Sequence, residues 1–230
     1  MINKDYFLRI KYFLKRCFYK NVSPPPAILY EKYRSYTMLR KDLYIQNLNL
    51  CLWYLPMQGA IVECGVWRGG MLAGMIECIG TQNRQFYAFD SFEGLPKASA
   101  IDGEKALIWQ SHTHSPVYYD NCKSNYEQVV NLLTPLGISR SNIVKGWFAD
   151  TLPHFKEPIA ILRLDADWYQ STYECLHFLF PYVVKGGLII IDDYYAWEGC
   201  SRAVHDFLSK EATNCTIRQW HNQIAYILKT

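Results

Sequence analysis

Two patterns of apolar and polar positions alternate along this chain. Short apolar runs that end in glycine or acidic residues predict buried strands, and longer stretches with apolar residues three and four positions apart predict helices. The predicted strands cover residues 60–66, 85–90, 141–148, 159–167 and 188–193. Continuous apolar strands that alternate with helices are typical of a mostly parallel sheet with helices on both faces, so the pattern predicts a doubly wound α/β fold.

Helical periodicity fills most of the sequence between these strands. Helices are expected over residues 35–55, 71–80, 124–137, 171–183 and 203–208. The tail from Ile217 to Leu228 predicts an antiparallel C-terminal hairpin that closes the sheet. Residues 97–120 show no clear period, and so long an irregular stretch inside a compact domain predicts a functional loop or a lid.

The first 26 residues differ from the rest of the chain. Residues 1–20 place apolar side chains near helical spacing with Lys and Arg between them, a pattern that suits either an anionic membrane surface or packing on this protein's own core. Three prolines at positions 24 to 26 predict an extended joint over residues 21–29. We therefore expect a basic arm with a proline-rich joint, residues 1–26, and one folded domain, residues 27–230.

Charge and cysteine content indicate which binding partners and which cellular compartment to expect. The net charge is only +3 and the basic residues are spread along the chain, which argues against nucleic-acid binding. The eight cysteines form no C-x-x-C motif, so we expect reduced thiols rather than disulfides or a zinc site. Within residues 1–20, charges interrupt each apolar run before it reaches the length that a secretory signal needs. We expect a cytoplasmic homo-oligomer, and residues 1–20 are the candidate for peripheral membrane contact if they do not pack on the protein's own core.

A glycine-containing turn follows the first predicted strand. Glu63 and Gly65 begin the sequence ECGVWRGG, in which the glycines permit a tight turn and a close approach of ligand to backbone. The turn lacks G-x-G-x-x-G, and an acid here suits a ligand with an ammonium group, such as the methionine part of S-adenosylmethionine. Asp90 ends the second strand, where a carboxylate can accept hydrogen bonds from ribose hydroxyls, and Ser91 follows it. NAD is the competing class of ligand.

Four aspartates follow two consecutive strands. Asp165 and Asp167 end one strand, and Asp192 and Asp193 end the next. These carboxylates would repel one another unless a cation, a proton or a base neutralised them, and a metal ion is the simplest answer. Oxygen ligands favour Mg²⁺, Mn²⁺ or Ca²⁺ over zinc. Because strand positions i and i+2 share a face, Asp165 and Asp167 could supply one ligand and one general base.

Several longer motifs resemble one known family. They are VECGVWRGG, AFDSFEGLP, VKGWFADTLP, LRLDADWYQSTYECL and KGGLIIIDDYYAWEGCSRAVHDFL. Together they are similar to the macrocin O-methyltransferase (TylF) family, whose members methylate sugar hydroxyls of natural products, and the similarity runs from about Tyr36 to the C-terminus. The resemblance implies a Rossmann-like class I methyltransferase fold, S-adenosylmethionine as methyl donor and assistance by Mg²⁺.

The resemblance also implies roles for individual residues. It places the metal on Asp165, Asp192 and Asp193 and makes Asp167 the general base. The residues that it implies for the donor site are Glu63, Gly65, Asp90 and Ser91, with Asp150 near the adenine. The N-terminal arm and residues 97–120 have no recognised counterpart, and both are expected to shape acceptor binding.

The expected function is therefore metal-assisted O-methyl transfer from S-adenosylmethionine to a hydroxyl of a sugar or glycosylated metabolite. A catechol-type or phenol-type O-methyltransferase would share the donor and the metal but take a flat aromatic acceptor. A second alternative is a non-catalytic, methyltransferase-like binding subunit, against which the intact acidic cluster argues. His112 and His114 are candidates for proton transfer or ligation, although isolated surface histidines are common.

Overall fold

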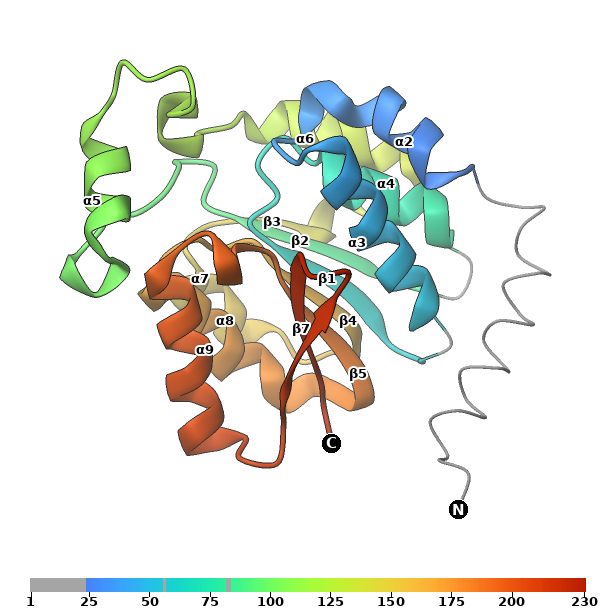
Figure 1. Ribbon diagram of the computed structural model, residues 1–230. Coiled ribbons are helices and arrows are strands. Elements are labelled where there is room, and N and C mark those ends of the chain that lie inside the picture. The colour runs from blue at the N-terminus through green and yellow to red at the C-terminus, as the bar shows by residue number, and fades with distance from the viewer. Residues whose placement is uncertain (1–23, 56, 82–83) are drawn as a thin grey trace.

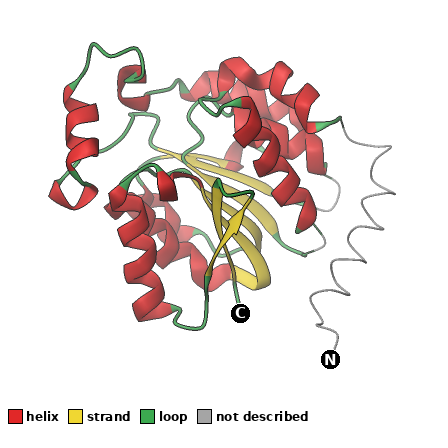
Figure 2. Cartoon of the chain, viewed as in Figure 1, coloured by secondary structure: helices red, strands yellow, loops and turns green. Residues whose placement is uncertain are grey.

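A computed structural model describes residues 24–55, 57–81 and 84–230 of the chain (Figure 1). A twisted sheet crosses the molecule, and helices pack on both of its sides (Figure 2). The predicted basic helix of residues 1–20 lies outside the described residues. No helix in the described part of the chain combines the length and the apolar character needed to cross a membrane.

The described residues form one sheet of seven strands in the order β3-β2-β1-β4-β5-β7-β6. Its strands are β1 (Ala60–Cys64), β2 (Phe86–Asp90), β3 (Ile143–Lys145), β4 (Ile159–Leu164), β5 (Val183–Ile191), β6 (Ile217–Trp220) and β7 (Ile224–Leu228). The first five strands pair in parallel, whereas β7 runs antiparallel to both β5 and β6. The mostly parallel sheet and the antiparallel C-terminal hairpin are confirmed. Strand order reverses between β1 and β4.

Two helical layers cover the two faces of the sheet. One layer contains α2 (Pro26–Tyr33), α3 (Lys41–Trp53), α4 (Gly70–Ile79) and α6 (Tyr126–Leu133), and the other contains α7 (Phe148–Thr151), α8 (Tyr169–Leu179) and α9 (Glu198–Glu211). Because side chains alternate across a strand, Ile61 packs into the first core and Val62 into the second. The short helix α5 (Glu104–Ser111) stands apart at the edge of the molecule (Figure 1).

Three expectations about local structure need correction. Residues 26–29 are not extended, because Pro26 occupies the first helical position of α2, where a missing N–H costs nothing. The third strand ends at Lys145 instead of continuing to residue 148, and Phe148 already begins α7. Residues 97–120 are not structureless, since they contain α5. The seven cysteines among the described residues form no disulfide.

The ends of β1 and β4 approach each other closely at Gly65. The amide of Gly65 donates to the Phe89 carbonyl at 2.8 Å, and the amide of Asp165 donates to the Cys64 carbonyl at 2.9 Å. Gly65 has a φ of +82°, and a Cβ atom added there would lie 1.7 Å from the Asp165 carbonyl oxygen. Glycine is therefore required at position 65 by the junction that carries the acidic strand end.

We expect Gly65→Ala to lower the free energy of unfolding well beyond the ordinary cost of alanine in a left-handed conformation. Gly80 is the matched control, because it has the same φ of +82° but, among the residues that the structure describes, no atom lies within 4 Å of an added Cβ. Gly80 has a ψ of 153°, a conformation almost confined to glycine, so Gly80→Ala should cost about 1–3 kcal/mol. Gly65→Ala should cost more, since backbone must also move. Urea unfolding of both variants measures the difference. Equal losses would show that the β1–β4 contact is not tight.

Candidate active site

A cavity of about 620 Å³ opens at the carboxyl ends of the central strands, where strand order reverses. This is the position at which open parallel sheets bind their ligands. Its lining includes Glu63, Gly65, Val66 and Trp67 at the end of β1, Asp90 and Ser91 at β2, residues 165–168 after β4, and Asp192 and Asp193 after β5. Residues 36–39 and 146–149 complete part of the wall.

Arg163 lies beneath this cavity, fully buried on β4. Its Nη1 donates to Oε1 of Glu63 at 2.6 Å and to Oδ2 of Asp165 at 2.8 Å. Its Nη2 pairs with Oδ1 of Asp192 at 2.7 Å, and its Nε donates to Oδ1 of Asn47 on α3 at 3.2 Å. One guanidinium therefore holds together acids at the carboxyl ends of three different strands.

One arginine does not neutralise this number of buried acids. Burial raises the pKa of Glu63 to about 8, although Arg163 opposes the rise. Burial and the charge of Asp165 raise the pKa of Asp167 to about 8. Burial raises the pKa of Asp192 to about 6 against the opposing charge of Arg163, and raises that of Asp193 well above its usual range. The site is therefore built to receive positive charge.

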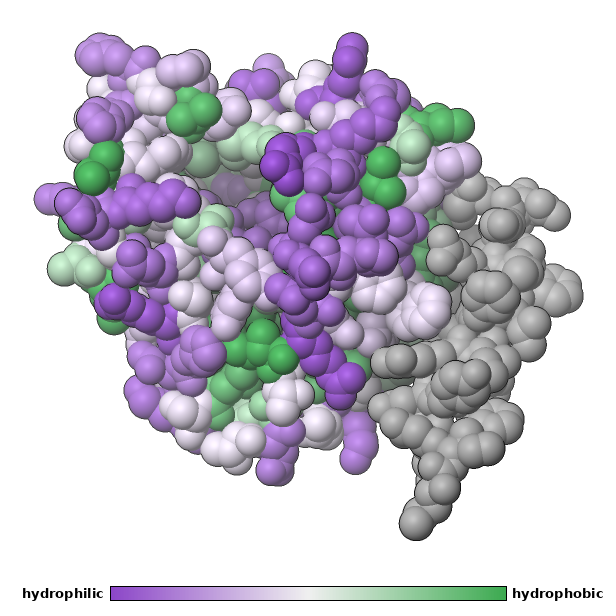
Figure 3. Space-filling model, in the orientation of Figure 1, coloured by the Kyte–Doolittle hydropathy of each residue, from purple (hydrophilic) through white to green (hydrophobic). Residues whose placement is uncertain are grey.

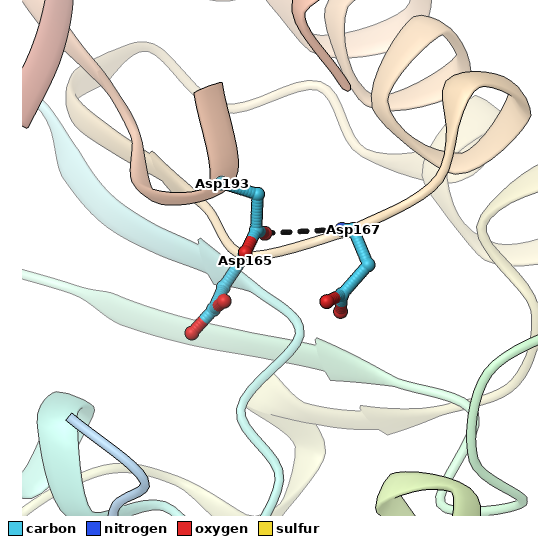
Figure 4. A group of neighbouring side chains, drawn as sticks. All are labelled: Asp165, Asp167 and Asp193. Carbon is cyan, nitrogen blue, oxygen red and sulfur yellow. Dashed lines mark hydrogen bonds between the residues drawn. The ribbon is translucent and has the colours of Figure 1, made fainter. Parts of the chain in front are cut away.

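Three of the acids form a compact group (Figure 4). Asp165, Asp167 and Asp193 each offer one oxygen within 4.8 Å of the others. The amide of Asp167 donates to Oδ2 of Asp193 at 3.1 Å, which links the loop after β4 to the end of β5. Asp167 has a φ of +55°, an uncommon conformation that the surrounding contacts must hold in place. Such a group could hold a divalent cation.

Trp197 fixes the orientation of Asp167. Its Nε1 donates to Oδ1 of Asp167 at 2.8 Å. The indole also packs edge-on against Trp168, at a centroid distance of 5.0 Å, and against Trp109 of α5, at 5.9 Å. The acidic group is thus connected through aromatic contacts to the helix that stands outside both layers.

Asp90 shapes the turn that follows β1. Its Oδ2 accepts hydrogen bonds from the amides of Val66 and Trp67 at 2.8 and 2.9 Å, and its Oδ1 accepts from the amide of Phe92 at 2.7 Å. Burial raises the pKa of Asp90, and these amides oppose the rise. The carboxylate therefore holds two loops together at the cavity wall.

Ser91 closes a local turn beside the cavity. Its hydroxyl donates to the Gly94 carbonyl at 3.0 Å and accepts from the Glu93 amide at 3.1 Å. Both hydrogen bonds stay within the loop after β2.

Some of the predicted site residues line the cavity and others do not. All predicted acids at the strand ends line the cavity, but Asp192 faces Arg163 and does not belong to the compact group. Asp150 is exposed on α7, where its neighbours 147–149 line the cavity instead. His112 and His114 are exposed near the end of α5.

Sequence reasoning did not identify Arg163 or Trp197. The one signal for Arg163 was a charged residue in the middle of an apolar strand. Trp197 lies within one of the family-like motifs but about thirty residues from its partner Asp167, so no local pattern connects the two.

We expect Arg163→Met to be strongly destabilising, because it keeps the side-chain volume but leaves buried carboxylates without their partner. Removing one member of a buried ion pair costs about 3–5 kcal/mol. Arg163→Lys should lose less, since it keeps the charge but not the fork of donors. Equilibrium unfolding in urea compares the two with the wild type. An Arg163→Met variant of unchanged stability would show that the network does not hold the strand ends together.

O-methyltransferases of Streptomyces are among the relatives of the chain. The 8-demethyl-8-(2,3-dimethoxy-alpha-L-rhamnosyl)-tetracenomycin-C 4'-O-methyltransferase of Streptomyces olivaceus is 35% identical over 177 residues, 71% of this chain and 64% of the relative. The demethyldecarbamoylnovobiocin O-methyltransferase of Streptomyces niveus is 32% identical over 177 residues, 72% of this chain and 65% of the relative. The chain thus spans less than two thirds of the length of either relative.

Solved structures share the architecture. The O-methyltransferase NovP superposes with a TM-score of 0.69 at 29% identity, over 85% of this chain and 82% of NovP. The calicheamicin methyltransferase CalS11 gives a TM-score of 0.65 over 95% of this chain and 91% of its own, and at 17% identity it shows the fold alone. The fold is a Rossmann-like class I methyltransferase fold, as the sequence predicted.

A family model covers most of the chain. The macrocin-O-methyltransferase (TylF) model matches residues 34–228, from the segment before α3 to the last strand. This span includes each of the acids that line the cavity. The resemblance inferred from the motifs is confirmed, and the chain belongs to the macrocin-O-methyltransferase family.

Proposed function

We propose that this protein transfers a methyl group from S-adenosylmethionine to a hydroxyl of a sugar or glycosylated small molecule, with the assistance of Mg²⁺ or Mn²⁺. One observation carries the proposal: a single cavity joins a glycine turn, suited to the donor, to a compact group of three aspartates, suited to a metal. Membership of the family and the names of the curated relatives support the same activity.

The donor side of the cavity suits a cationic ligand. Oε2 of Glu63 is buried without a hydrogen-bond partner among the described residues, although Oε1 is paired with Arg163. An ammonium group would satisfy this oxygen. S-adenosylmethionine, when bound, supplies an electrophilic methyl group on a positively charged sulfur, and the surrounding carboxylates favour that charge. Asp90 contributes by holding the turn against which the donor would lie.

Asp165 and Asp193 are the acids best placed to hold a metal, because they belong both to the predicted ligand set and to the compact group. Arg163 holds Asp165, and the Asp167 amide holds Asp193, so each carboxylate is fixed by a neighbour, as metal ligands usually are. Asp192 would add its second oxygen, since Arg163 pairs with Oδ1. A bound divalent cation supplies charge that lowers the pKa of an acceptor hydroxyl.

Asp167 is the proposed general base. Trp197 fixes one of its oxygens, and burial raises its pKa to about 8, close to the range in which a base works best near neutral pH. Holding the acceptor hydroxyl between Asp167 and the donor would supply much of the rate through orientation.

The first test is methyl transfer with a labelled donor and Mg²⁺ over sugars, glycosides, sugar nucleotides and phenols. We expect labelled product from a sugar-containing acceptor and loss of turnover with excess EDTA. Calorimetry should detect binding of S-adenosylhomocysteine and not of NAD. Methylation of a catechol alone would favour the phenol-type alternative, and binding of NAD alone would contradict the donor assignment.

The second test separates the metal ligands from the base. Asp167→Asn should reduce kcat by about 10²–10⁴-fold, while Mn²⁺ affinity, measured by electron paramagnetic resonance, changes little. Asp193→Asn and Asp192→Asn should weaken Mn²⁺ binding instead. Glu211→Gln, at an exposed acid on the far end of α9, is the control. Loss of Mn²⁺ affinity in Asp167→Asn with retention in Asp192→Asn would make Asp167 the third ligand.

A further inference from the structure

A second cavity adjoins the active site between α5 and the start of α9. It has a volume of about 560 Å³, and we call it the α5–α9 groove. It shares Trp109, Val117 and Trp197 with the active-site cavity, and Ile108 lines it from α5. Apolar side chains interrupt the hydrophilic surface in this part of the molecule (Figure 3).

We propose that the α5–α9 groove binds a second, uncharged sugar unit of the acceptor, so that the methylated sugar belongs to a disaccharide or a longer glycan. This inference rests on the proposed function and specifies its acceptor. The shared tryptophans make the groove continuous with the wall of the active site. A unit linked to the reacting sugar would therefore reach the groove across Val117, a residue that is 53% exposed.

The chemistry of the groove suits a sugar. Trp109 and Ile108 offer apolar surface for the C–H faces of a ring, since indole is flat and apolar with one polar edge. Glu104 and Glu198 offer acceptors for hydroxyl groups, and Lys105 offers a donor. Flat apolar walls with hydrogen-bonding groups of both kinds at the rim match a ligand that carries hydroxyls around an apolar ring.

The charge of both cavities disfavours a phosphate-linked acceptor. Eight carboxylate residues line the active-site cavity, whereas Lys97 is its one basic lining residue in the described part of the chain. The groove is lined by Glu104, Glu198, Lys105 and His112, and Arg202 pairs with Glu198 at 3.2 Å, so few of its basic groups are free to bind a phosphate. A pyrophosphate would meet repulsion from these carboxylates without the arginines that usually bind it. The groove therefore suits an uncharged glycoside better than a nucleotide-linked sugar.

The walls of the groove are held in place before any ligand binds. Nζ of Lys105 donates to the Ala196 carbonyl at 2.9 Å and lies 4.8 Å from the Trp197 ring centroid. Nε1 of Trp109 donates to the Val117 carbonyl at 3.0 Å. Gly103 lets α5 approach α9, because an added Cβ would lie 2.8 Å from Cδ of Glu198. A preformed groove avoids much of the entropy cost of binding.

The test compares steady-state methylation of a monosaccharide methyl glycoside, identified in the acceptor screen, with disaccharides that carry the same sugar at the non-reducing end. We expect a KM for at least one disaccharide at least about fivefold below that for the monosaccharide. Ile108→Ala should remove about this advantage, because it deletes apolar contact worth roughly a factor of five. Leu107→Ala is the matched control, since Leu107 is a similarly exposed apolar residue of α5 outside the groove lining.

The other possible results separate failure of the proposed function from failure of the second sugar site. If no sugar is methylated, the proposed function fails and the inference fails with it. If monosaccharide and disaccharides have equal KM values, or if Ile108→Ala behaves like Leu107→Ala, the second sugar site is wrong while the proposed function stands. A lower KM for the nucleotide diphosphate of the same sugar, or for its glycoside with a flat aromatic aglycone, would assign the groove to that group instead.

Discussion

The contact on which this site depends is the burial of Arg163 among acids from neighbouring strands. Its guanidinium pairs with Glu63 near the end of β1, Asp165 after β4 and Asp192 after β5. A buried ion pair is poor evidence for stability, because desolvation offsets the attraction. Here the arrangement has another consequence. The guanidinium of Arg163 holds together acids that would otherwise repel one another, and the negative charge that it leaves uncompensated can receive a donor and a metal ion.

The remaining contacts divide this charge between two sides of the cavity. Oε2 of Glu63 has no hydrogen-bond partner in the described part of the chain and lies on the donor side, whereas Asp165, Asp167 and Asp193 converge on the other. The left-handed backbone at Asp167 turns its amide toward Asp193, and Trp197 holds its side chain. Through the contact of Trp197 with Trp109, the acids are also linked to α5, which borders the region where an acceptor would enter.

The sequence predicted the sheet well because each buried strand forms a continuous apolar run, and the acids at strand ends mark one edge of the sheet. It predicted less where the outcome depends on contacts distant along the chain. Arg163 looked like an interruption of an apolar strand until its partners from β1 and β5 were in place. The position of Asp192 could not be predicted either, because its contact with Arg163 arises from the side-by-side pairing of β4 and β5.

The helix α5 shows the same limitation. Its eight residues carry almost no amphipathic pattern, and its place is set by Trp109 and Lys105 contacts with the start of α9, nearly ninety residues away. Hydrophobic periodicity predicts helices that pack one face against a large core. It does not predict a helix that is held in place by only a few side chains. The prediction of a functional segment at residues 97–120 therefore came from its length alone.

Anomalous diffraction from crystals grown with Mn²⁺ and S-adenosylhomocysteine tests the central claim most directly. We predict one strong anomalous-difference peak for Mn²⁺ between Asp165 and Asp193, with Arg163 still paired with Glu63 and Asp165. A peak elsewhere in the cavity, or an Arg163 side chain released from both acids when the metal binds, would contradict it.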